Sequence, residues 1–425
     1  MSIAKKLSLV LLASSVLYSP VAMAQQMGLV SLSDDELSEV EGQALLSLSY
    51  IDPTDRINMM PGKDVGFYKL GLEAELELNA NIRKLQLGCG GINGPGGCDI
   101  DIDHLSLSGL SESSDGRASS SAKMSNPFVQ FAIKNPNSAA GREVLGVRMS
   151  AEKVMGLLTL GSENSATPNG INSFSGYMKI KDATGTANTA SRDMTYADTG
   201  QMINGRILPK IWFIPTIPIG FSSNDYNLKL QATDARLAVD GQVISGTRMS
   251  NVMLKGTAYI NTLNFAGDLQ AQAGVFNLSK VVTGNITNLR ADLSIDQNLG
   301  FIHKLPLNNP FSLSLQSSQV YWPGADAAAE KGWWMAFDDA VDIGNITPSD
   351  KIVITNDVLR QIVRPISDYL TNNPVECQLL NCIAGKNLEV GNINLPNTIL
   401  KFPLKDLQLV NQRFAPNCYG GMKFC

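Results

Sequence analysis

The stretch LEAELELNANI, residues 72–82, alternates apolar and polar side chains. Leucine, alanine and isoleucine occupy every second position, while glutamate and asparagine lie between them. Successive side chains of a strand point to opposite faces, so this period predicts a β-strand with one buried and one solvated face. The stretch DIDID, residues 99–103, alternates in the same way and predicts a second such strand.

Similar short segments continue beyond residue 225, among them LKLQAT, ARLAV, GTAYINTL, GDLQAQAGVFNLS and RADLSID. Glycines that we interpret as turn signals recur among them at Gly246, Gly256, Gly267, Gly274 and Gly284. Short strands with regular turn signals are typical of all-β proteins. We therefore predict a mainly β fold, which would be an elongated antiparallel sheet, a sandwich or a β-solenoid.

Composition excludes several classes of protein. Of the 425 residues, 44% are hydrophobic, an ordinary share for a globular chain and too high for a disordered one. The formal net charge of -5 offers no basic footprint for nucleic acid. Only 17% of the residues are charged, so serine, threonine, asparagine and glycine must cover much of the surface.

The beginning of the chain has the pattern of a secretory signal peptide. Lys5 and Lys6 precede an apolar run at residues 7–17, and the small-residue pattern AMA ends at residue 24. A membrane anchor is the alternative, but the run is shorter than the roughly 20 residues that cross a bilayer. We therefore expect export to the periplasm, the outer-membrane surface or an extracellular filament, with cleavage before Gln25.

The cysteines agree with export, because they fall in three close pairs. These are Cys89 and Cys98, Cys377 and Cys382, and Cys418 and Cys425. Disulfides between near neighbours are the simplest pairing in an exported chain. A zinc site is the alternative, although the spacing and the two histidines of the chain fit no zinc pattern.

A short helix is predicted directly behind the cleavage site. Ser33 and Glu36 occupy the two ends of a capping box, and Gly42 is suited to end the helix. Leu32, Leu37 and Val40 supply apolar contacts, so this helix is a candidate docking element or a cap on the β-core.

A second helix is expected near the C-terminus, after Thr355, with Pro365 kinking or splitting it. Its apolar face would carry Val358, Leu359, Ile362, Val363, Ile366 and Leu370. The predicted organisation is a signal at 1–24, a helical motif at 25–45, a β-rich body at 46–345 and a helical, Cys-rich segment at 346–425. The β-rich body would be one unit, or two units at about 46–200 and 201–345.

The apolar segment ILPKIWFIPTIPI, residues 207–219, contains three prolines. Proline cannot donate to a β-ladder, so we do not expect this segment in a central strand. It either crosses one end of the β-core or forms an exposed partner or membrane contact, in which case Trp212 and Phe213 are the candidate docking side chains.

Asp99, Asp101 and Asp103 are the best metal candidates. On a strand their carboxylates would share one face, and clustered oxygens suit Ca²⁺. A solvated strand face is the alternative, because His104 and Leu110 stand where an EF-hand loop needs glycine and glutamate. Neither histidine belongs to a hydrolase motif, so we predict no enzyme and no catalytic residue.

The N-terminal motif L-x-D-x-E-L-S-x-V-x-G-Q resembles that of exported envelope proteins of Gram-negative bacteria, among them pilus assembly proteins of the Fil type. It consists here of Leu32, Asp34, Glu36, Leu37, Ser38, Val40, Gly42 and Gln43. The phrases NPFVQFAIKNPNS at 126–138 and GWWMAFDD at 332–339 add to the resemblance. Double-glycine leaders of bacteriocins share part of the motif, but Gln43 replaces their second glycine.

The resemblance implies a role in building or decorating a surface filament, with other pilus or envelope proteins as partners. It implies no enzymatic activity. We therefore expect an exported structural or assembly protein of a pilus, adhesive or oligomeric in some settings. An outer-membrane or lipid-binding β protein and an envelope hydrolase are the alternatives.

Overall fold

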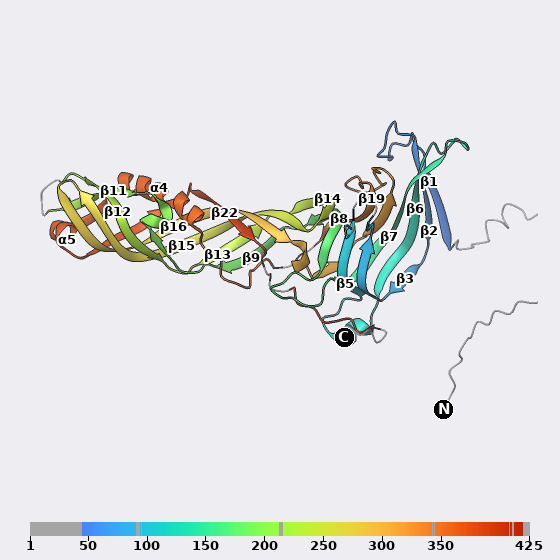
Figure 1. The fold of residues 1–425 in the computed structure, drawn as a ribbon, viewed down its shortest axis with the longest axis horizontal. Helices are drawn as coiled ribbons and strands as arrows, with labels where there is room; N and C mark the ends of the chain where they lie inside the picture. Colours follow the sequence, from blue (N-terminus) through green and yellow to red (C-terminus); the bar gives the residue numbers. More distant parts are fainter. Residues whose placement is uncertain are drawn as a thin grey trace, which may run out of the picture. The chain divides into compact units, whose positions relative to one another are not determined.

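The computed structural model describes residues 45–419 except for 91–93, 95, 212–215, 342, 344, 408, 410 and 411. Strands dominate these residues and helices are few, which confirms the prediction of a mainly β fold. The strands belong to two sheets (Figure 1). The predicted signal peptide and the predicted helix with Leu32, Leu37 and Val40 lie outside the described residues.

The first sheet has 12 strands, and its main path runs β1-β2-β6-β7-β18-β19-β8-β5-β4. Its strands are β1 (Leu46–Ile51), β2 (Val65–Leu72), β3 (Glu75–Leu78), β4 (Ala80–Leu87), β5 (Ile100–Ser108), β6 (Ala122–Lys134), β7 (Glu143–Thr159), β8 (Ile171–Ile180), β14 (Gln242–Met249), β17 (Lys304–Leu307), β18 (Ser312–Gln316) and β19 (Gly332–Val341). β5 also pairs with β7, so that β7, β18, β19, β8 and β5 form a closed ring of paired strands. β1 and β4 remain the two outer strands of the path.

The second sheet has 10 strands and is built around one long hairpin. Its strands are β9 (Ala183–Asn188), β10 (Arg192–Thr195), β11 (Ile203–Lys210), β12 (Ile219–Leu230), β13 (Asp234–Val239), β15 (Asn251–Ala273), β16 (Phe276–Asn298), β20 (Val375–Gln378), β21 (Asn387–Asn394) and β22 (Ile399–Lys405). β15 and β16 form the hairpin. On the side of β15 the strand order is β20-β11-β12-β15-β13-β9, and on the other side β21 and β22 pair in parallel with β16.

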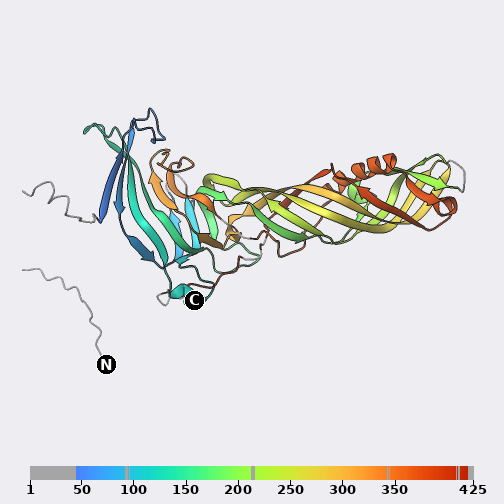
Figure 2. The same ribbon diagram turned by 180° about the vertical axis from the view of Figure 1, so that it is seen from behind.

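The helices are α2 (Ser114–Ala118), α3 (Tyr196–Thr199), α4 (Asn356–Asn372), α5 (Leu379–Ile383) and the 3-10 turn η2 (Leu299–Phe301). The predicted apolar side chains of α4 are all buried. The helix continues through Pro365, so the expected split does not occur. Figures 1 and 2 show α4 lying along the second sheet, where it contacts β11, β21 and β22.

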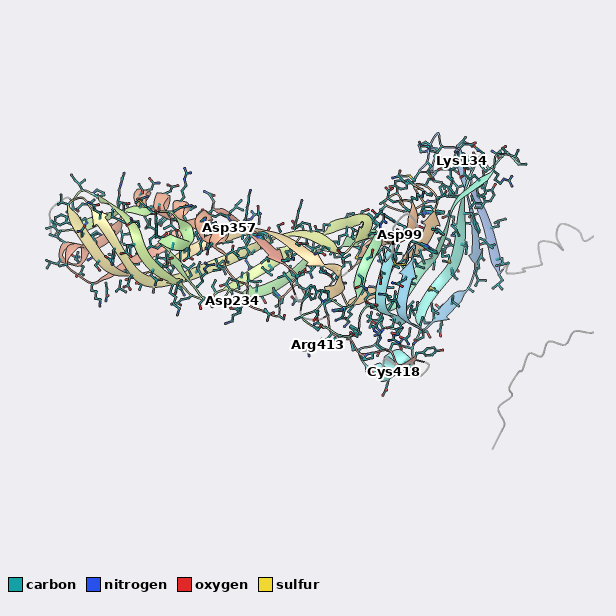
Figure 3. All side chains as sticks on the ribbon, in the orientation of Figure 1. Asp99, Lys134, Asp234, Asp357, Arg413 and Cys418 are labelled. Atoms are coloured by element: carbon teal, nitrogen blue, oxygen red, sulfur yellow. A yellow bond between two sulfur atoms is a disulfide. The ribbon has the colours of Figure 1, made fainter. Side chains whose placement is uncertain are left out.

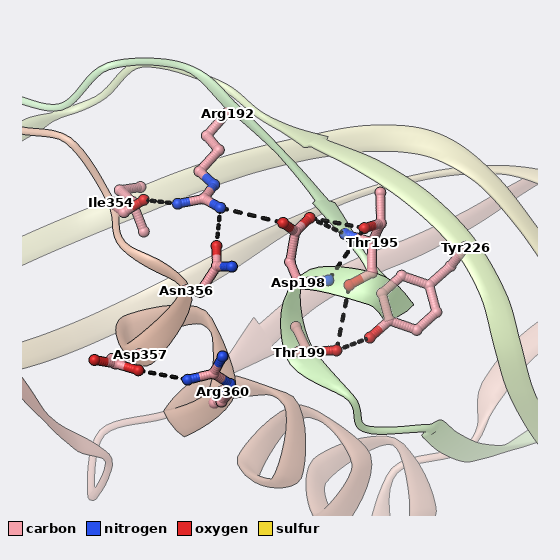
Figure 4. A network of polar contacts seen from close by, with 9 residues as sticks. All are labelled: Arg192, Thr195, Asp198, Thr199, Tyr226, Ile354, Asn356, Asp357 and Arg360. Carbon is pink, nitrogen blue, oxygen red and sulfur yellow. Dashed lines mark hydrogen bonds and ion pairs between the residues drawn. The ribbon is translucent and has the colours of Figure 1, made fainter.

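A polar network around Arg192 fixes the beginning of α4 (Figure 4). The Arg192 guanidinium donates to the carbonyl oxygen of Ile354 and to the side chain of Asn356, and it lies 3.3 Å from the carboxylate of Asp198. Asp198 also accepts from the Thr195 hydroxyl at 2.7 Å, and the hydrogen bonds from Thr195 hold the pKa of Asp198 below its usual value. The network therefore joins α4 to β10 and α3.

The sheets do not follow the boundary at about residue 200 that we considered for two units. β9 and β10 precede that point but belong to the second sheet, whereas β14, β17, β18 and β19 follow it and belong to the first. The segment 346–425 contributes β20, β21 and β22 to the second sheet, and its last residues contact the rest of the chain. The backbone N–H of His303 donates to the side-chain oxygen of Gln412 at 2.8 Å, and buried Arg117 donates to the carbonyl of Ala415 at 2.7 Å.

One local expectation was wrong, and another agrees with the structure only in part. The alternating stretch 72–82 is not one strand, because β2 ends within it, β3 pairs with β6, and β4 pairs with β5. Pro209 lies inside β11, between β20 and β12. It is tolerated there because β12 pairs with β11 only as far as Ile207, so the missing N–H falls beyond that ladder.

Most of the glycines that we interpreted as turn signals lie inside strands. Only Gly274 forms a hairpin turn, with a φ of 58°, whereas Gly256 and Gly267 lie within β15 and Gly284 lies within β16. A side chain at Gly267 would overlap the carbonyl oxygen of Asn227 on β12. These glycines therefore permit the close approach of neighbouring backbones in a strongly coiled sheet.

We predict that Gly267→Ala lowers the free energy of unfolding by about 2–3 kcal/mol, because the added methyl group displaces the β12 backbone. Gly220→Ala is the matched control, since its added carbon would have no heavy atom closer than 4.0 Å. Urea unfolding of both variants under oxidising conditions tests this. Equal stability of the two variants would contradict the close-approach explanation.

Candidate interaction surface

The acidic row at the beginning of β5 does not form a shared site. Asp99, which is labelled in Figure 3, precedes the strand and is buried. Its carboxylate accepts a hydrogen bond from the backbone N–H of Trp333 at 3.0 Å. Asp101 and Asp103 face a different neighbour, Lys84 of β4, whose Nζ lies 2.5 Å and 2.9 Å from their carboxylates. The three aspartates therefore do not share a site. Asp99 binds a backbone N–H, whereas Asp101 and Asp103 form an ion-paired cluster with Lys84.

An amide completes that cluster. Asn172 donates to the carboxylates of Asp101 and Asp103 at 3.2 Å and 2.7 Å, and Gln86 donates to Asp101 at 2.9 Å. Burial opposes ionisation of Asp101, but the hydrogen bonds from Lys84, Gln86 and Asn172 outweigh it and lower its pKa. An ammonium group thus stands where Ca²⁺ would have to bind.

The calcium prediction is corrected accordingly. Across the part of the chain that the structure describes, no group of three histidine, cysteine or acidic residues is arranged to hold a metal ion. His104 lies at an irregular point of β5 with a φ of 48°. His303 is buried, with Nδ1 2.9 Å from the carbonyl oxygen of Leu160, and burial lowers its pKa.

The structure forms two of the three predicted disulfides, Cys89–Cys98 and Cys377–Cys382. Their presence indicates that the chain folds in an oxidising, exported environment. Cys418 forms no disulfide with any described residue, and its predicted partner Cys425 lies outside them, so that pairing stays a prediction. The candidate docking residues Trp212 and Phe213 also lie outside the described residues.

The strand β1 is an unprotected sheet edge. Its sequence LSLSYI has no charged residue and no proline, and it pairs with β2 on one side. No other described strand pairs with β1. Leu46 and Leu48 are 59% and 75% exposed. Natural sheets usually protect such edges with charge, proline or a bulge.

Two rows of apolar side chains cross the sheet from this edge, and we call them together the apolar face. Register pairs place in one row Leu48, Leu70, Val129, Met149 and Leu313, and in the other Tyr50, Tyr68, Phe131, Val147 and Leu315. Directly opposed side chains in neighbouring strands lie close enough to pack. Each row therefore forms a continuous strip across β1, β2, β6, β7 and β18.

The apolar face is open to solvent along much of its length. Leu70 and Met149 are 45% and 48% exposed, and Phe131 is 37% exposed. A groove of about 660 Å³ lies along the first of these rows, with walls from six strands and the segment before β18. Its walls include Leu46, Leu70, Leu78, Met124, Phe128, Met149, Phe311 and Leu313. Contiguous apolar surface of this kind marks binding sites in soluble proteins.

The other outer strand of the sheet is protected. β4 carries Arg83 and Lys84 in adjacent positions, and Lys84 belongs to the ion-paired cluster. A strand approaching β4 would have to accommodate these cations, whereas a strand approaching β1 would meet only serine, leucine and tyrosine side chains and an isoleucine. The two edges therefore differ in their capacity to accept a further strand.

Neither β1 nor the apolar face was among the predictions from sequence. The alternation in LSLSYI was an available signal for the strand. No local signal identifies the apolar face, because its side chains come from segments more than 250 residues apart. No family model, curated protein or solved structure matches this chain. Among the helices of the described residues, none has both the length and the apolar character needed to cross a bilayer.

We predict that Asp101→Asn lowers the free energy of unfolding at pH 7 by about 0.5–1 kcal/mol. The pKa of Asp101 is lowered in the folded state, so its ionised form contributes stability above its ordinary value of 3.8. This contribution is lost as the pH falls through the folded pKa, and the difference between variant and wild type should then disappear. Denaturant titrations between pH 7 and pH 3 measure it.

Asp193→Asn is the control, because Asp193 is exposed on β10 and lies outside the cluster. It should change stability little at either pH. A difference between Asp101→Asn and the wild type that stayed constant with pH would argue against the ion-paired cluster.

Proposed function

We propose that this chain is an exported structural or assembly protein of the bacterial surface, and that it joins its partner by strand addition to β1. The observation that supports the proposal is the unprotected edge of β1 with the apolar face behind it. In strand addition, main-chain hydrogen bonds supply affinity and alternate side chains supply specificity. The expected partner is a pilus or envelope protein with an extended, alternating apolar segment.

The geometry favours this mode of binding over a generic hydrophobic contact. Leu48 and Tyr50 begin the two rows of the apolar face, so each row would gain one more member from an added strand. The free backbone groups of β1 would gain partners in the same step. A partner strand with apolar side chains at alternate positions would therefore form backbone hydrogen bonds with β1 and also extend the two rows of the apolar face.

The two alternatives receive less support. A lipid carrier needs an enclosed interior that holds an acyl chain. The apolar cavity between α4 and the second sheet has a volume of only about 50 Å³, and the groove of about 660 Å³ lies on an exposed face rather than in an interior. A hydrolase needs converging acidic or histidine groups, and Asp101 is instead held by Lys84 and Asn172. The resemblance to envelope proteins points in the same direction as the β1 edge.

We predict that Leu48→Lys weakens partner binding about tenfold or more, because a buried leucine side chain contributes about 1.5–3 kcal/mol and a charge at the edge opposes strand addition. Surface filaments and adhesion would be scored in a deletion strain that carries the variant. Export and disulfide formation should stay normal, since Leu48 is mostly exposed in the folded chain.

Val353→Lys is the matched control, because Val353 is 63% exposed and lies outside the strands. It should restore filaments and adhesion as the wild type does. If deletion of the gene left both intact, the proposed function would fail, and if Leu48→Lys restored both fully, strand addition at β1 would fail.

A further inference from the structure

A polar groove on the second sheet combines an aromatic ring with a guanidinium group. The groove has a volume of about 500 Å³, which is within the range of small-ligand sites. The residues that line it are Thr184, Gly185, Thr186, Arg236, Leu237, Ala238, Tyr259 and Asn345. None of these described residues is acidic, although the whole chain carries a net negative charge.

Strand register explains how the groove arises. Thr186 of β9 is opposite Arg236 of β13, and Arg236 is opposite Tyr259 of β15. In the next row, Thr184 of β9 is opposite Ala238 of β13. The side chains beside Arg236 and Tyr259 are therefore mostly small, which leaves a trough along β9 and β13.

The aromatic ring borders this trough on one side. Arg290 of β16 lies over the Tyr259 ring, with its guanidinium carbon 5.8 Å from the ring centroid. β16 and β13 flank β15 on opposite sides, so the groove meets the ring from the direction that Arg290 does not occupy. Tyr259 is 41% exposed. An exposed aromatic face offers a stacking surface for a ring with apolar C–H groups.

Arg236 and Asn345 bring hydrogen-bond donors to the groove. The side chain of Arg236 is exposed, and within the described residues it has neither an ion-pair partner nor a hydrogen-bond acceptor. The side-chain oxygen of Asn345 accepts from the backbone N–H of Thr347 at 2.8 Å, which orients the amide. A guanidinium group binds a carboxylate through two parallel hydrogen bonds, and an amide N–H₂ group donates to hydroxyl oxygens.

Other classes of ligand fit this groove less well. A peptide cannot add to the outer side of β9 as a strand, because the segment after β19 already binds there. The backbone N–H of Ile346 donates to the carbonyl oxygen of Thr184 at 3.4 Å. The backbone N–H of Ile352 donates to that of Asn188 at 2.8 Å. An apolar ligand would cover Arg236 without giving it an acceptor, which is unfavourable.

We propose that this groove binds an acidic saccharide, with one sugar ring stacked on Tyr259 and its carboxylate accepting from Arg236. A sugar ring provides the C–H face and the oxygen acceptors together. Asn345 and the threonine hydroxyls then bind ring hydroxyl groups. Because the whole chain has a net charge of -5, it does not attract polyanions in general, and recognition depends on this local arrangement. The inference is independent of strand addition at β1, which belongs to the other sheet.

Calorimetric titration of the full oxidised chain with alginate oligosaccharides, which consist of uronic acids, tests the proposal. We expect saturable binding, and weaker binding of dextran oligosaccharides, which are neutral. Arg236→Ala should raise the Kd for alginate about tenfold, because it removes the partner of the carboxylate. Tyr259→Leu should raise it about three- to tenfold, whereas Tyr259→Phe keeps the ring and should bind nearly as the wild type does.

Arg206→Ala is the matched control, because Arg206 is an exposed arginine on β11 that does not line the groove. It should bind alginate as the wild type does. Circular dichroism and thermal unfolding of all variants should match the wild type, since the altered side chains are exposed. Absence of alginate binding, or unchanged binding by both Arg236→Ala and Tyr259→Leu, would overturn the proposal. Binding of dextran or polyglutamate as tight as that of alginate would also overturn it.

Discussion

Backbone hydrogen bonding along the β15–β16 hairpin is the constraint on which the second sheet depends. Every donor and acceptor over Asn251–Ala273 and Phe276–Asn298 requires a partner, and neither strand of the hairpin can provide more than one side of the ladder. β12 and β13 pair with residues 265–273 and 256–259 of β15, and the C-terminal strands β21 and β22 pair with residues 281–287 and 290–296 of β16. Glycines within the hairpin allow these neighbours to approach closely where the sheet coils.

The same need for backbone hydrogen-bond partners distinguishes β1 from the hairpin strands and from β4. The long hairpin is covered on both sides by described strands, and β4 carries cations that discourage a further strand. Among the described residues, β1 has no second neighbouring strand, and its own sequence carries no charge. An apolar edge of this kind invites aggregation in a monomer, which is the reason for our proposal that a partner strand completes it.

The acidic cluster illustrates how tertiary structure redirects a local pattern. Alternation alone places Asp101 and Asp103 on one strand face, and this part of the expectation agrees with the structure. Lys84 reaches that face because β4 pairs with β5, and Asn172 reaches it from β8. The two carboxylates thereby share one ammonium group, which makes them a stabilising contact between strands rather than a cation site.

The sequence by itself determined the β-rich class, the buried apolar side of α4 and the two near-neighbour disulfides, because hydrophobic period and short cysteine spacing act over a few residues. It could not determine the sheet order, the role of Gly267, or the apolar face that begins at Leu48 and Tyr50. These depend on register between segments far apart in the chain. Each glycine or leucine looks the same locally whether its neighbour is solvent, a turn or another strand, and only the tertiary structure decides which neighbour it has.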